Sequence, residues 1–445
     1  MVQRIRVEFK GEGSGEEELS WGQWAQWGAI QADKGRVLSA GGMMPLAAGT
    51  TEQELAYLLS FIMSRHETLR TTLRFEDGVP RQVVHESGEL DIEVYDAGEG
   101  EDPADLAKEI NDRYEAQGWE LEHGWPVRWA IVRKDGVPAH FVALYNHFVI
   151  DAYGFEALIA DLPNMDKETG RQLAPVPGLQ PRDQVAKQRT PNALRQGAAS
   201  LRHWEQQLRT IPLTQFPQQP QPQSPRWWRA TFTSRAAFLA MEVIAQRTKV
   251  HTGTVILAAY AKALADVTGV NTSVIRILVS NRFRPGLKDS VSSVAQSALC
   301  VVETEQENFD LVVDSAFRSQ VAAGTHAYYD PRELWKLIAK VGQERGSEPE
   351  MRCYYNDRRR SMAAGVEITQ VATKEEVIAA LAESKLQWEP PSDNPSAVAF
   401  LLVNGVPDVL DYTLIGDTQR LSPADMEACM RGLETSLIHG AFGDK

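Results

Sequence analysis

The spacing of apolar positions after Thr51 predicts a helix with one buried face. Thr51 and Glu54 have the three-residue separation of a capping box, in which each side chain accepts a hydrogen bond from the other residue's backbone N–H. Beyond this box, apolar residues recur every three or four positions, as one side of a helix packed on a core requires. The apolar stripe consists of Leu55, Leu58, Leu59, Ile62 and Met63.

Along the rest of the chain, segments with helical spacing and segments with strand spacing follow one another, but they do not alternate regularly as strand, helix and strand. Alternating apolar positions around turn dipeptides such as Asp77-Gly78 predict paired strands, whereas spacing of three to four residues predicts helices. Thr252 is expected to cap a long helix that ends at Gly269, and Ser422, followed by Pro423, caps a final helix. This order predicts an α+β protein with two similar lobes. The other helices are expected near residues 15–30, 103–117, 155–162, 191–209, 252–267, 309–323, 331–341 and 374–384, and the strands near 4–10, 70–75, 81–85, 126–132, 140–147, 273–280, 397–403 and 409–414.

The length of the chain predicts two domains rather than one. A chain of 445 residues exceeds what a single ordinary core accommodates and suits two domains of about 200 residues each. Proline and glutamine dominate residues 212–225, which is typical of a surface connection. We therefore expect an N-terminal lobe at residues 1–175, a crossing at 176–228 and a C-terminal lobe at 229–445.

Composition and charge argue against several classes of function. The net charge of -14 disfavours binding to a phosphate backbone, so nucleic acid is not an expected partner. The chain has no apolar run approaching the roughly 18 to 20 residues of a membrane span, and its N-terminus lacks the features of a signal peptide. The three cysteines, Cys300, Cys353 and Cys429, lie far apart, which argues against a disulfide framework and against a structural zinc site. We expect a cytoplasmic protein that does not bind to membranes.

His147 is the strongest candidate for an acid–base group. It lies at the end of an expected strand, and Asp151 follows four residues later, in the turn before a helix. A histidine at a strand terminus can project into a cleft while the strand holds its backbone, and a general base needs fixed geometry before its pKa matters. A histidine near an aspartate is also common in structural roles, so this pair alone does not identify a catalytic site.

Four segments in the same order resemble one family, the condensation domains of nonribosomal peptide synthesis and their free-standing relatives. Residues 146–152 read NHFVIDA, beside the family's central HHxxxDG motif, and residues 65–71 read RHETLRT, close to the family's RHExLRT segment. Residues 19–23 read LSWGQ and are followed by Trp27, which looks like the family's opening helix motif. Residues 281–286 read NRFRPG and resemble a segment of the family's second lobe. The resemblance therefore extends over nearly the whole chain.

The resemblance implies a chloramphenicol-acetyltransferase-like fold, in which two lobes form a V-shaped pseudo-dimer around a central tunnel. It implies that a donor acyl group arrives as a thioester on the phosphopantetheine arm of a peptidyl or acyl carrier protein. A small-molecule amine or alcohol acceptor then attacks the thioester, and an amide or ester forms without a bound metal or other bound cofactor. Activity of this kind belongs to the biosynthesis of natural products such as antibiotics. Two lobes within one chain are compatible with a monomer.

The resemblance also assigns roles within the central motif. His147 corresponds to the family's catalytic histidine, which deprotonates or orients the attacking nucleophile. Asp151 corresponds to the motif's aspartate, which in the family is mainly structural, and Arg282 is its expected partner, with Arg284 as second choice. The backbone N–H of Ala152 is expected near the developing oxyanion. The expected catalytic group is therefore His147, Asp151 and Ala152.

Two positions depart from the family's central motif. Asn146 stands where the family has its first histidine, and Ala152 stands where the family has glycine. Asn146 can still hydrogen-bond within the loop, so we expect it to support the loop structurally. Alanine is strained at positive φ, so if the position of Ala152 needs such a backbone we expect Gly154 to take over the tight turn.

The RHETLRT segment has a structural interpretation alongside its resemblance to the family. Arg65, His66, Glu67 and Arg70 lie at an expected helix end, where an ion-pair and capping network is the simpler explanation of their charges. We therefore expect Arg65 to support the site structurally rather than to take part in the reaction.

Two further candidates lie in the expected second lobe. His326 occupies a region where family members have a recurring histidine-containing segment, and it is a candidate for lining the tunnel. Arg358 begins a run of three arginines, Arg358 to Arg360, in an otherwise acidic chain. This run is either a solvated turn or a landing patch for an acidic carrier protein or the phosphate of phosphopantetheine.

Three functions remain open on the sequence. The leading hypothesis is an acyltransferase that condenses a carrier-bound acyl group with an amine or a hydroxyl. The alternative is a condensation-fold scaffold that binds carrier proteins and recruits partner enzymes without catalysis. The altered Asn146 and Ala152 favour this alternative, whereas the retained His147 and Asp151 oppose it. Epimerisation shares the fold and requires an additional carboxylate facing the histidine; the identities of donor and acceptor are not encoded in any recognisable motif.

Overall fold

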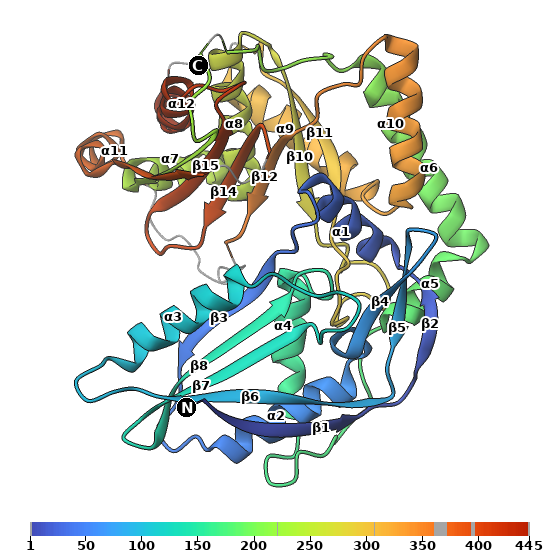
Figure 1. Ribbon diagram of the computed structural model, residues 1–445. Helices are drawn as coiled ribbons and strands as arrows, with labels where there is room; N and C mark the ends of the chain where they lie inside the picture. Colours follow the sequence, from blue (N-terminus) through green and yellow to red (C-terminus); the bar gives the residue numbers. More distant parts are fainter. Residues whose placement is uncertain (1, 220, 307, 360–371, 393–396, 444–445) are drawn as a thin grey trace. The chain divides into compact units, whose positions relative to one another are not determined.

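The chain divides into two compact units (Figure 1). The computed structural model of the protein describes residues 2–219, 221–306, 308–359, 372–392 and 397–443. Unit 1 contains Met1–Gln196 and Ser280–Gln296, and unit 2 contains Gly197–Val279 and Ser297–Lys445.

The two units differ from the expected lobes in two places. The expected crossing, residues 176–228, is divided between the units after Gln196. Residues 280–296, which the sequence analysis places in the C-terminal lobe, belong to unit 1. The physical reason for the second difference is that Arg282, within this segment, forms an ion pair with Asp151 of unit 1.

Unit 1 is built on a five-stranded sheet with the strand order β1-β6-β7-β8-β3. Strands β6 and β7 run parallel, and every other neighbouring pair in this sheet is antiparallel. The two edges of the sheet are therefore β1 and β3, and β8, which leads to His147, is paired on both sides. The strands are β1 (Gln3–Lys10), β3 (Ser39–Pro45), β6 (Ser87–Asp96), β7 (Val127–Lys134) and β8 (Val137–Asn146).

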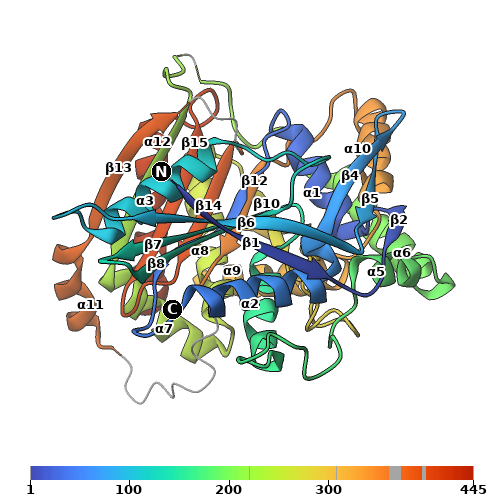
Figure 2. The same cartoon turned by 60° about the horizontal axis from the view of Figure 1, so that its bottom comes forward.

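Helices cover both faces of this sheet. Helix α3 (Pro103–Ala116) packs on the face that carries Val132, and α2 (Glu52–Arg65) packs in the core that contains Ile131. Successive side chains of a strand point to opposite faces, so burial on both sides explains why β7 has an uninterrupted apolar run rather than an alternating one. Figure 2 shows α2 running alongside β1.

The predicted start of α2 is confirmed. The Thr51 side chain accepts a hydrogen bond from Glu54 N, and the Glu54 side chain accepts one from Thr51 N, which completes the capping box. Four members of the predicted stripe, Leu55, Leu59, Ile62 and Met63, are buried.

Residues 15–30 form a strand followed by a helix, so the single helix expected there is wrong. The strand pairs within a separate three-stranded sheet, where Glu16 forms an ion pair of 3.0 Å with Arg74. Helix α1 (Trp21–Ala32) begins only after Ser20, whose side chain accepts a hydrogen bond from Gln23 N. The small sheet consists of β2 (Gly15–Glu18), β5 (Val79–Val84) and β4 (Thr71–Glu76).

Unit 2 is built on a seven-stranded sheet with the order β11-β10-β12-β14-β15-β9-β13. Strands β10, β12 and β14 are parallel to one another, and β14, β15, β9 and β13 are antiparallel along the rest of the sheet. The strands are β9 (Trp227–Ser234), β10 (Thr272–Val279), β11 (Gln296–Glu303), β12 (Cys353–Asp357), β13 (Lys385–Ser392), β14 (Ala399–Asn404) and β15 (Leu410–Asp417).

Helix α8 (Thr252–Thr268) runs through the core of unit 2. Its N-cap is His251 rather than the expected Thr252, because the His251 ring accepts a hydrogen bond of 3.1 Å from Gly253 N. The expected stop at Gly269 is confirmed, since this residue has a φ of 72°, a left-handed backbone in which glycine is unstrained.

The remaining helices connect and cover these sheets. None of the helices in the described ranges combines the length and the apolar character that crossing a membrane demands. They are α4 (Ala152–Asp161), α5 (Pro181–Gln188), α6 (Pro191–Thr210), α7 (Arg235–Thr248), α9 (Phe309–Thr325), α10 (Pro331–Arg345), α11 (Lys374–Ala380) and α12 (Pro423–Phe442), with short 3-10 helices η1 (Glu67–Arg70), η2 (Leu162–Asn164) and η3 (Leu381–Glu383).

Candidate active site

His147 lies in the short loop between β8 and α4, and its backbone is held from two sides. Its N–H donates to the carbonyl oxygen of Leu38 at 2.8 Å, next to the start of β3. Its carbonyl oxygen accepts a hydrogen bond of 3.0 Å from the Ser293 hydroxyl. The side chain is half-buried, and its Nδ1 is buried without a hydrogen-bond partner in the described part of the chain. The backbone position of His147 is therefore fixed by hydrogen bonds that do not involve its imidazole ring.

Asn146 stabilises the same loop through hydrogen bonds to the backbone of nearby residues. Its side-chain oxygen accepts a hydrogen bond of 2.8 Å from Phe148 N, and its carbonyl oxygen accepts one of 3.1 Å from Val149 N. The residue is only 2% exposed. An asparagine side chain that bonds the backbone two residues later stabilises a turn, so Asn146 supports the loop around His147 structurally.

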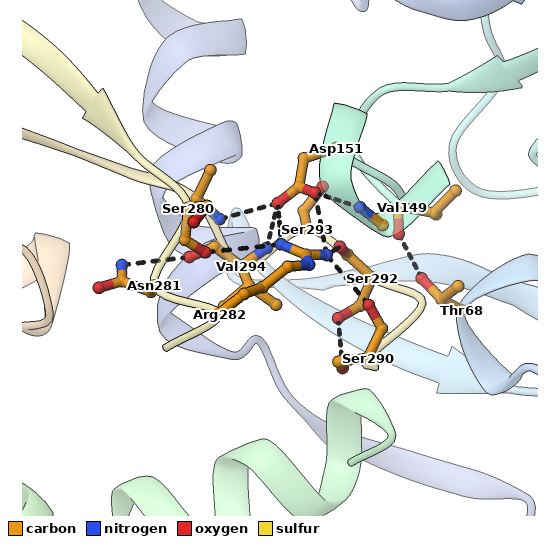
Figure 3. A network of polar contacts seen from close by, with 12 residues as sticks. Thr68, Val149, Asp151, Ser280, Asn281, Arg282, Ser290, Ser292, Ser293 and Val294 are labelled. Atoms are coloured by element: carbon orange, nitrogen blue, oxygen red, sulfur yellow. Dashed lines mark hydrogen bonds and ion pairs between the residues drawn. The ribbon is translucent and has the colours of Figure 1, made fainter. Parts of the chain in front are cut away.

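Asp151 and Arg282 form a buried ion pair beside this loop (Figure 3). Asp151 is the N-cap of α4, and its Oδ1 accepts a hydrogen bond of 2.7 Å from Gly154 N. Its Oδ2 accepts from the backbone N–H groups of Val294 and Ala295, at 2.8 and 2.9 Å. Both oxygens of Asp151 are thus occupied by protein donors, which supports a positioning role for this residue rather than a direct role in the reaction.

Arg282 also binds the segment on which it lies. Its Nη2 donates to the carbonyl oxygens of Ser290 and Ser292, at 3.0 and 3.1 Å, in addition to its contacts with Asp151. Arg284, the second candidate partner, instead donates to the side chain of Asn281 at 3.0 Å. Since Ser293 bonds the His147 carbonyl, the ion pair holds in place the segment that in turn holds the histidine backbone.

Neither Ala152 nor Gly154 has the left-handed backbone that was considered for this turn. Ala152 is the exposed first residue of α4 and does not have a positive φ, so alanine is unstrained there. Gly154 does not have a positive φ either, and the expectation that it takes over a tight turn is wrong. A Cβ on Gly154 would lie 2.7 Å from the carbonyl oxygen of Ser292, so glycine permits close packing of α4 on the neighbouring segment.

Arg65 lies in a separate buried network centred on Asp161. The Arg65 guanidinium donates to Asp161 Oδ1 at 2.9 Å and to the carbonyl oxygen of Ala174 at 2.6 Å. His66 Nε2 lies 3.1 Å from Asp161 Oδ2. Burial opposes ionisation of Asp161, but hydrogen bonds from His66 and Arg65 outweigh it and hold the pKa of this carboxyl well below its ordinary value. Burial lowers the pKa of His66 below its ordinary value.

The rest of the RHETLRT segment is joined to neighbouring backbone. The Arg70 guanidinium donates to the carbonyl oxygen of Gly13 at 2.6 Å, and Glu67 forms an ion pair with Arg182. The Thr68 hydroxyl donates to the carbonyl oxygen of Val149 at 2.6 Å (Figure 3). Through Thr68 this segment supports the His147 loop, and its charged residues form the ion-pair network that the sequence suggests.

The two candidates of the second lobe lie in unit 2, outside this group. His326 is the C-cap of α9, and its ring stacks on the ring of His203 with a centroid distance of 4.3 Å. Arg358 is exposed and donates to the side chain of Asn404. Arg359 forms an ion pair of 2.6 Å with Asp357, and Arg360 lies outside the described residues.

Three supporting residues were not identified from the sequence, although one of them, Thr68, lies within the RHETLRT segment. Ser293, Thr68 and Asp161 act through contacts with residues that are distant in the chain, at separations of 146, 81 and 96 positions. Serine, threonine and aspartate are common at surfaces and caps, so their residue type alone gave no reason to select them.

A family model covers the part of the chain that carries this site. The model described as "Condensation domain" matches residues 37–348, which include the His147 loop and the segment with Arg282. The cyclosporin synthetase of Tolypocladium inflatum is 27% identical over 324 residues, which are 69% of this chain and 2% of that protein. The beauvericin nonribosomal cyclodepsipeptide synthetase of Beauveria bassiana is 25% identical over 324 residues, 69% of this chain and 10% of that protein. The chain thus spans only a small part of the length of these relatives.

Solved structures agree on the fold. The condensation domain that mediates chain release from the enacyloxin polyketide synthase matches with a TM-score of 0.69 and 18% identity, over 96% of this chain and 83% of that one. The epimerization domain from the third module of tyrocidine synthetase B matches with a TM-score of 0.70 and 13% identity, over 97% and 98%. The X-domain from teicoplanin biosynthesis matches with a TM-score of 0.70 and 17% identity, over 95% and 94%. These likenesses show the fold, and with the family model they establish that the chain belongs to the condensation-domain family.

Proposed function

We propose that this protein is an acyltransferase that condenses a carrier-bound acyl thioester with an amine or hydroxyl acceptor, with His147 as general base. The observation that carries the proposal is the double backbone anchorage of His147, through Leu38 and Ser293. A general base must be held in fixed geometry, and here the hydrogen bonds that hold it leave the imidazole side chain free.

The proposed reaction uses the imidazole of His147 as the proton acceptor. Nε2 of His147 accepts the proton of the amine or hydroxyl as its nitrogen or oxygen attacks the thioester carbonyl carbon. The tetrahedral intermediate then expels the thiolate of the carrier arm, which takes up the proton from the imidazolium. One amide or ester bond forms, one carbon–sulfur bond breaks, and no oxidant or reductant is required.

Ala152 is the proposed source of oxyanion stabilisation. It is the first residue of α4, so its N–H is one of the donors that a helix leaves unpaired at its start. No acceptor in the described residues bonds this N–H. A backbone donor needs no particular side chain, which is compatible with alanine where the family has glycine.

A non-catalytic scaffold is the second candidate, and a fold likeness favours it. The X-domain from teicoplanin biosynthesis, which shares this fold, has been solved in a complex with OxyB. A chain of this fold that recruits a partner protein has no need of a free histidine nitrogen. The retention of His147 in a fixed loop favours the acyltransferase.

The test measures product formation with a panel of acyl-carrier donors and amine or alcohol acceptors. Wild type, His147→Ala and His140→Ala are compared by mass spectrometry of the products, with carrier affinity measured in parallel. His140 is a matched control, because it lies on β8, the strand that leads to His147, and its Nδ1 is also buried without a partner among the described residues. Product that depends on His147 but not on His140 supports the acyltransferase. Tight carrier binding by all three forms without product from any donor contradicts it and favours the scaffold.

A further inference from the structure

The two edge strands of the unit 1 sheet differ in whether other described residues cover their outward backbone groups. At β1, α2 covers outward backbone groups: the Ser60 hydroxyl donates to the carbonyl oxygen of Glu8 at 2.7 Å, and Lys10 N donates to the Ser64 hydroxyl at 3.2 Å. Covering an edge in this way prevents it from pairing with another chain. Strand β3, at the other edge, has no such cover among the described residues.

The hydrogen bonds of β3 show which of its backbone groups are open. His147 N donates to Leu38 O at one end of the ladder, and Leu46 N donates to Ala139 O at the other. The register is continuous between them. Residues of an antiparallel strand alternate between facing the partner and facing away, so even-numbered positions face β8. The N–H and carbonyl groups of Ser39, Gly41 and Met43 therefore point away from the sheet, and none of them bonds to a described residue.

The side chains along this edge leave room for another strand. Gly41 has no side chain, and both Gly41 and Met43 are exposed. Met44, the next residue, is 46% exposed. Glycine at position 41 is required by the pairing with β8, because its φ is 113° and a Cβ there would lie 2.1 Å from the carbonyl oxygen of Ala143. The exposed methionines can adapt their shape to different apolar partners. Pro45, which has no N–H, limits the pairing edge at the far end.

The open edge begins at the candidate active site. Ser39, its first open position, pairs in the ladder with Asn146, and Leu38 bonds directly to the backbone of His147. A chain paired along β3 would therefore have one end at the His147 loop. Because β3 runs away from this loop, a peptide whose C-terminal acyl group lies at His147 would run antiparallel to β3.

We propose that the open edge of β3 binds the peptidyl group of the carrier-bound donor as an added antiparallel strand, with its thioester end at His147. This proposal rests on the proposed function and names the substrate class: an extended peptidyl chain rather than a simple acyl or aryl group. The three open residues, Ser39, Gly41 and Met43, alternate along the strand and span a length that a peptide of about five residues would cover. Main-chain hydrogen bonds supply the affinity and tolerate many side chains, as in other cases of strand addition.

N-methylation tests the proposal directly. Binding of pentapeptidyl-pantetheine thioesters to His147→Ala, which is used to prevent turnover, is measured for a series with a single N-methyl group at each position. Methylating an amide that points toward β3 removes a hydrogen bond and introduces a clash, so we expect binding weaker by about 10-fold or more. Methylation at the alternate positions, which point away, is the built-in control and should change binding by less than about 3-fold. Equal effects at all positions would overturn the proposal.

Amide hydrogen exchange measured by NMR gives a second readout. Bound pentapeptide should slow exchange at Gly41 and Met43, whereas Gly42 and Met44, which already face β8, should change little. Met43→Pro, which removes one open N–H, should weaken binding, and Met43→Ala, which retains it, should not. Protection of Gly41 and Met43 that rises with protein concentration in the absence of peptide would assign the edge to self-association and overturn the proposal.

The outcomes separate this proposal from the proposed function. If wild type forms product but N-methylation has no alternating effect, only the strand site fails. If the alternating effect and the exchange pattern are found but no donor gives product, the peptide site stands and the acyltransferase fails.

Discussion

The guanidinium of Arg282 contacts both carboxylate oxygens of Asp151, with Nη2 3.0 Å from Oδ1 and Nη1 3.1 Å from Oδ2. The two residues are 131 positions apart in the chain. Their pairing holds residues 280–296 against the loop that carries His147, and Ser293 of this segment bonds the His147 carbonyl. The ion pair is thus a structural element of the candidate site.

Breaking this pair should destabilise the protein strongly. Asp151 and Arg282 are 3% and 9% exposed, and removing one partner of a buried pair leaves the other charge uncompensated. We expect Asp151→Ala or Arg282→Gln to lower the free energy of unfolding by about 3–5 kcal/mol in urea titrations. Lys108→Ala, which breaks an exposed pair with Asp112, is the control and should leave the free energy of unfolding nearly unchanged, because solvent screens this pair. A stable but inactive Asp151→Ala protein would argue for a direct role in the reaction instead.

Gly154→Ala should destabilise the protein although alanine is the better helix former. The added Cβ would lie 2.7 Å from the Ser292 carbonyl oxygen, so α4 or the neighbouring segment must shift, at a cost of about 1–3 kcal/mol. Gly324→Ala in α9 is the matched control, since its Cβ would meet no atom within 4 Å. We expect this control to stabilise by about 0.5–1 kcal/mol. Thermal unfolding of both variants measures the difference, and equal shifts would contradict the packing role of Gly154.

Asn146 should affect the reaction through the position of His147. Asn146→Ala removes the acceptor for Phe148 N, whereas Asn146→Asp retains an oxygen there. We expect Asn146→Ala to lower kcat by about 10-fold with little change in carrier affinity, because misplacing a base slows the chemical step. Asn146→Asp should retain most of the activity. If both variants behaved alike, the loop-shaping role would be refuted.

The stability of the protein should decrease as the pH is lowered below 6.5, because of His66. Burial sets the folded-state pKa of His66 below its ordinary value of 6.5, so as the pH falls through 6.5 the unfolded chain takes up a proton before the folded protein does. The contribution of His66 is therefore complete above pH 6.5 and is lost below it, by at most about 1.4 kcal/mol per pH unit. Urea unfolding of wild type and His66→Gln between pH 7.5 and about 5 should give curves that converge at low pH. Parallel curves would contradict the assignment.

The elements with strong periodicity could be predicted from the sequence, and those without it could not. Helix α2 was predictable because its capping box and apolar stripe agree. Strand β3 was missed because Gly41, Gly42 and Pro45 are poor strand formers, and its place is set by pairing with β8. The strand at Gly15–Glu18 was missed because three successive glutamates have no apolar alternation, and cross-strand partners such as Arg74 stabilise it.

Those residues of the candidate site that belong to a family motif could be predicted from the sequence. His147 and Asp151 follow from the central motif, and the family segment pointed to Arg282. The conformation of the loop was not predictable, because the packing of Gly154 depends on contacts with Ser292 and Arg282, which are distant in the sequence. Ser293 was missed for the same reason, since its bond to His147 joins positions that only the fold brings together.

The most direct test of the account is a single-turnover measurement with an acyl-loaded carrier protein and an acceptor, both saturating. The rate of product formation by His147→Ala is compared with that of wild type and His140→Ala. If His147 is the general base, its removal should slow this step by about 100- to 10,000-fold without weakening carrier binding, and His140→Ala should react at close to the wild-type rate. An unchanged rate in His147→Ala would contradict the central claim.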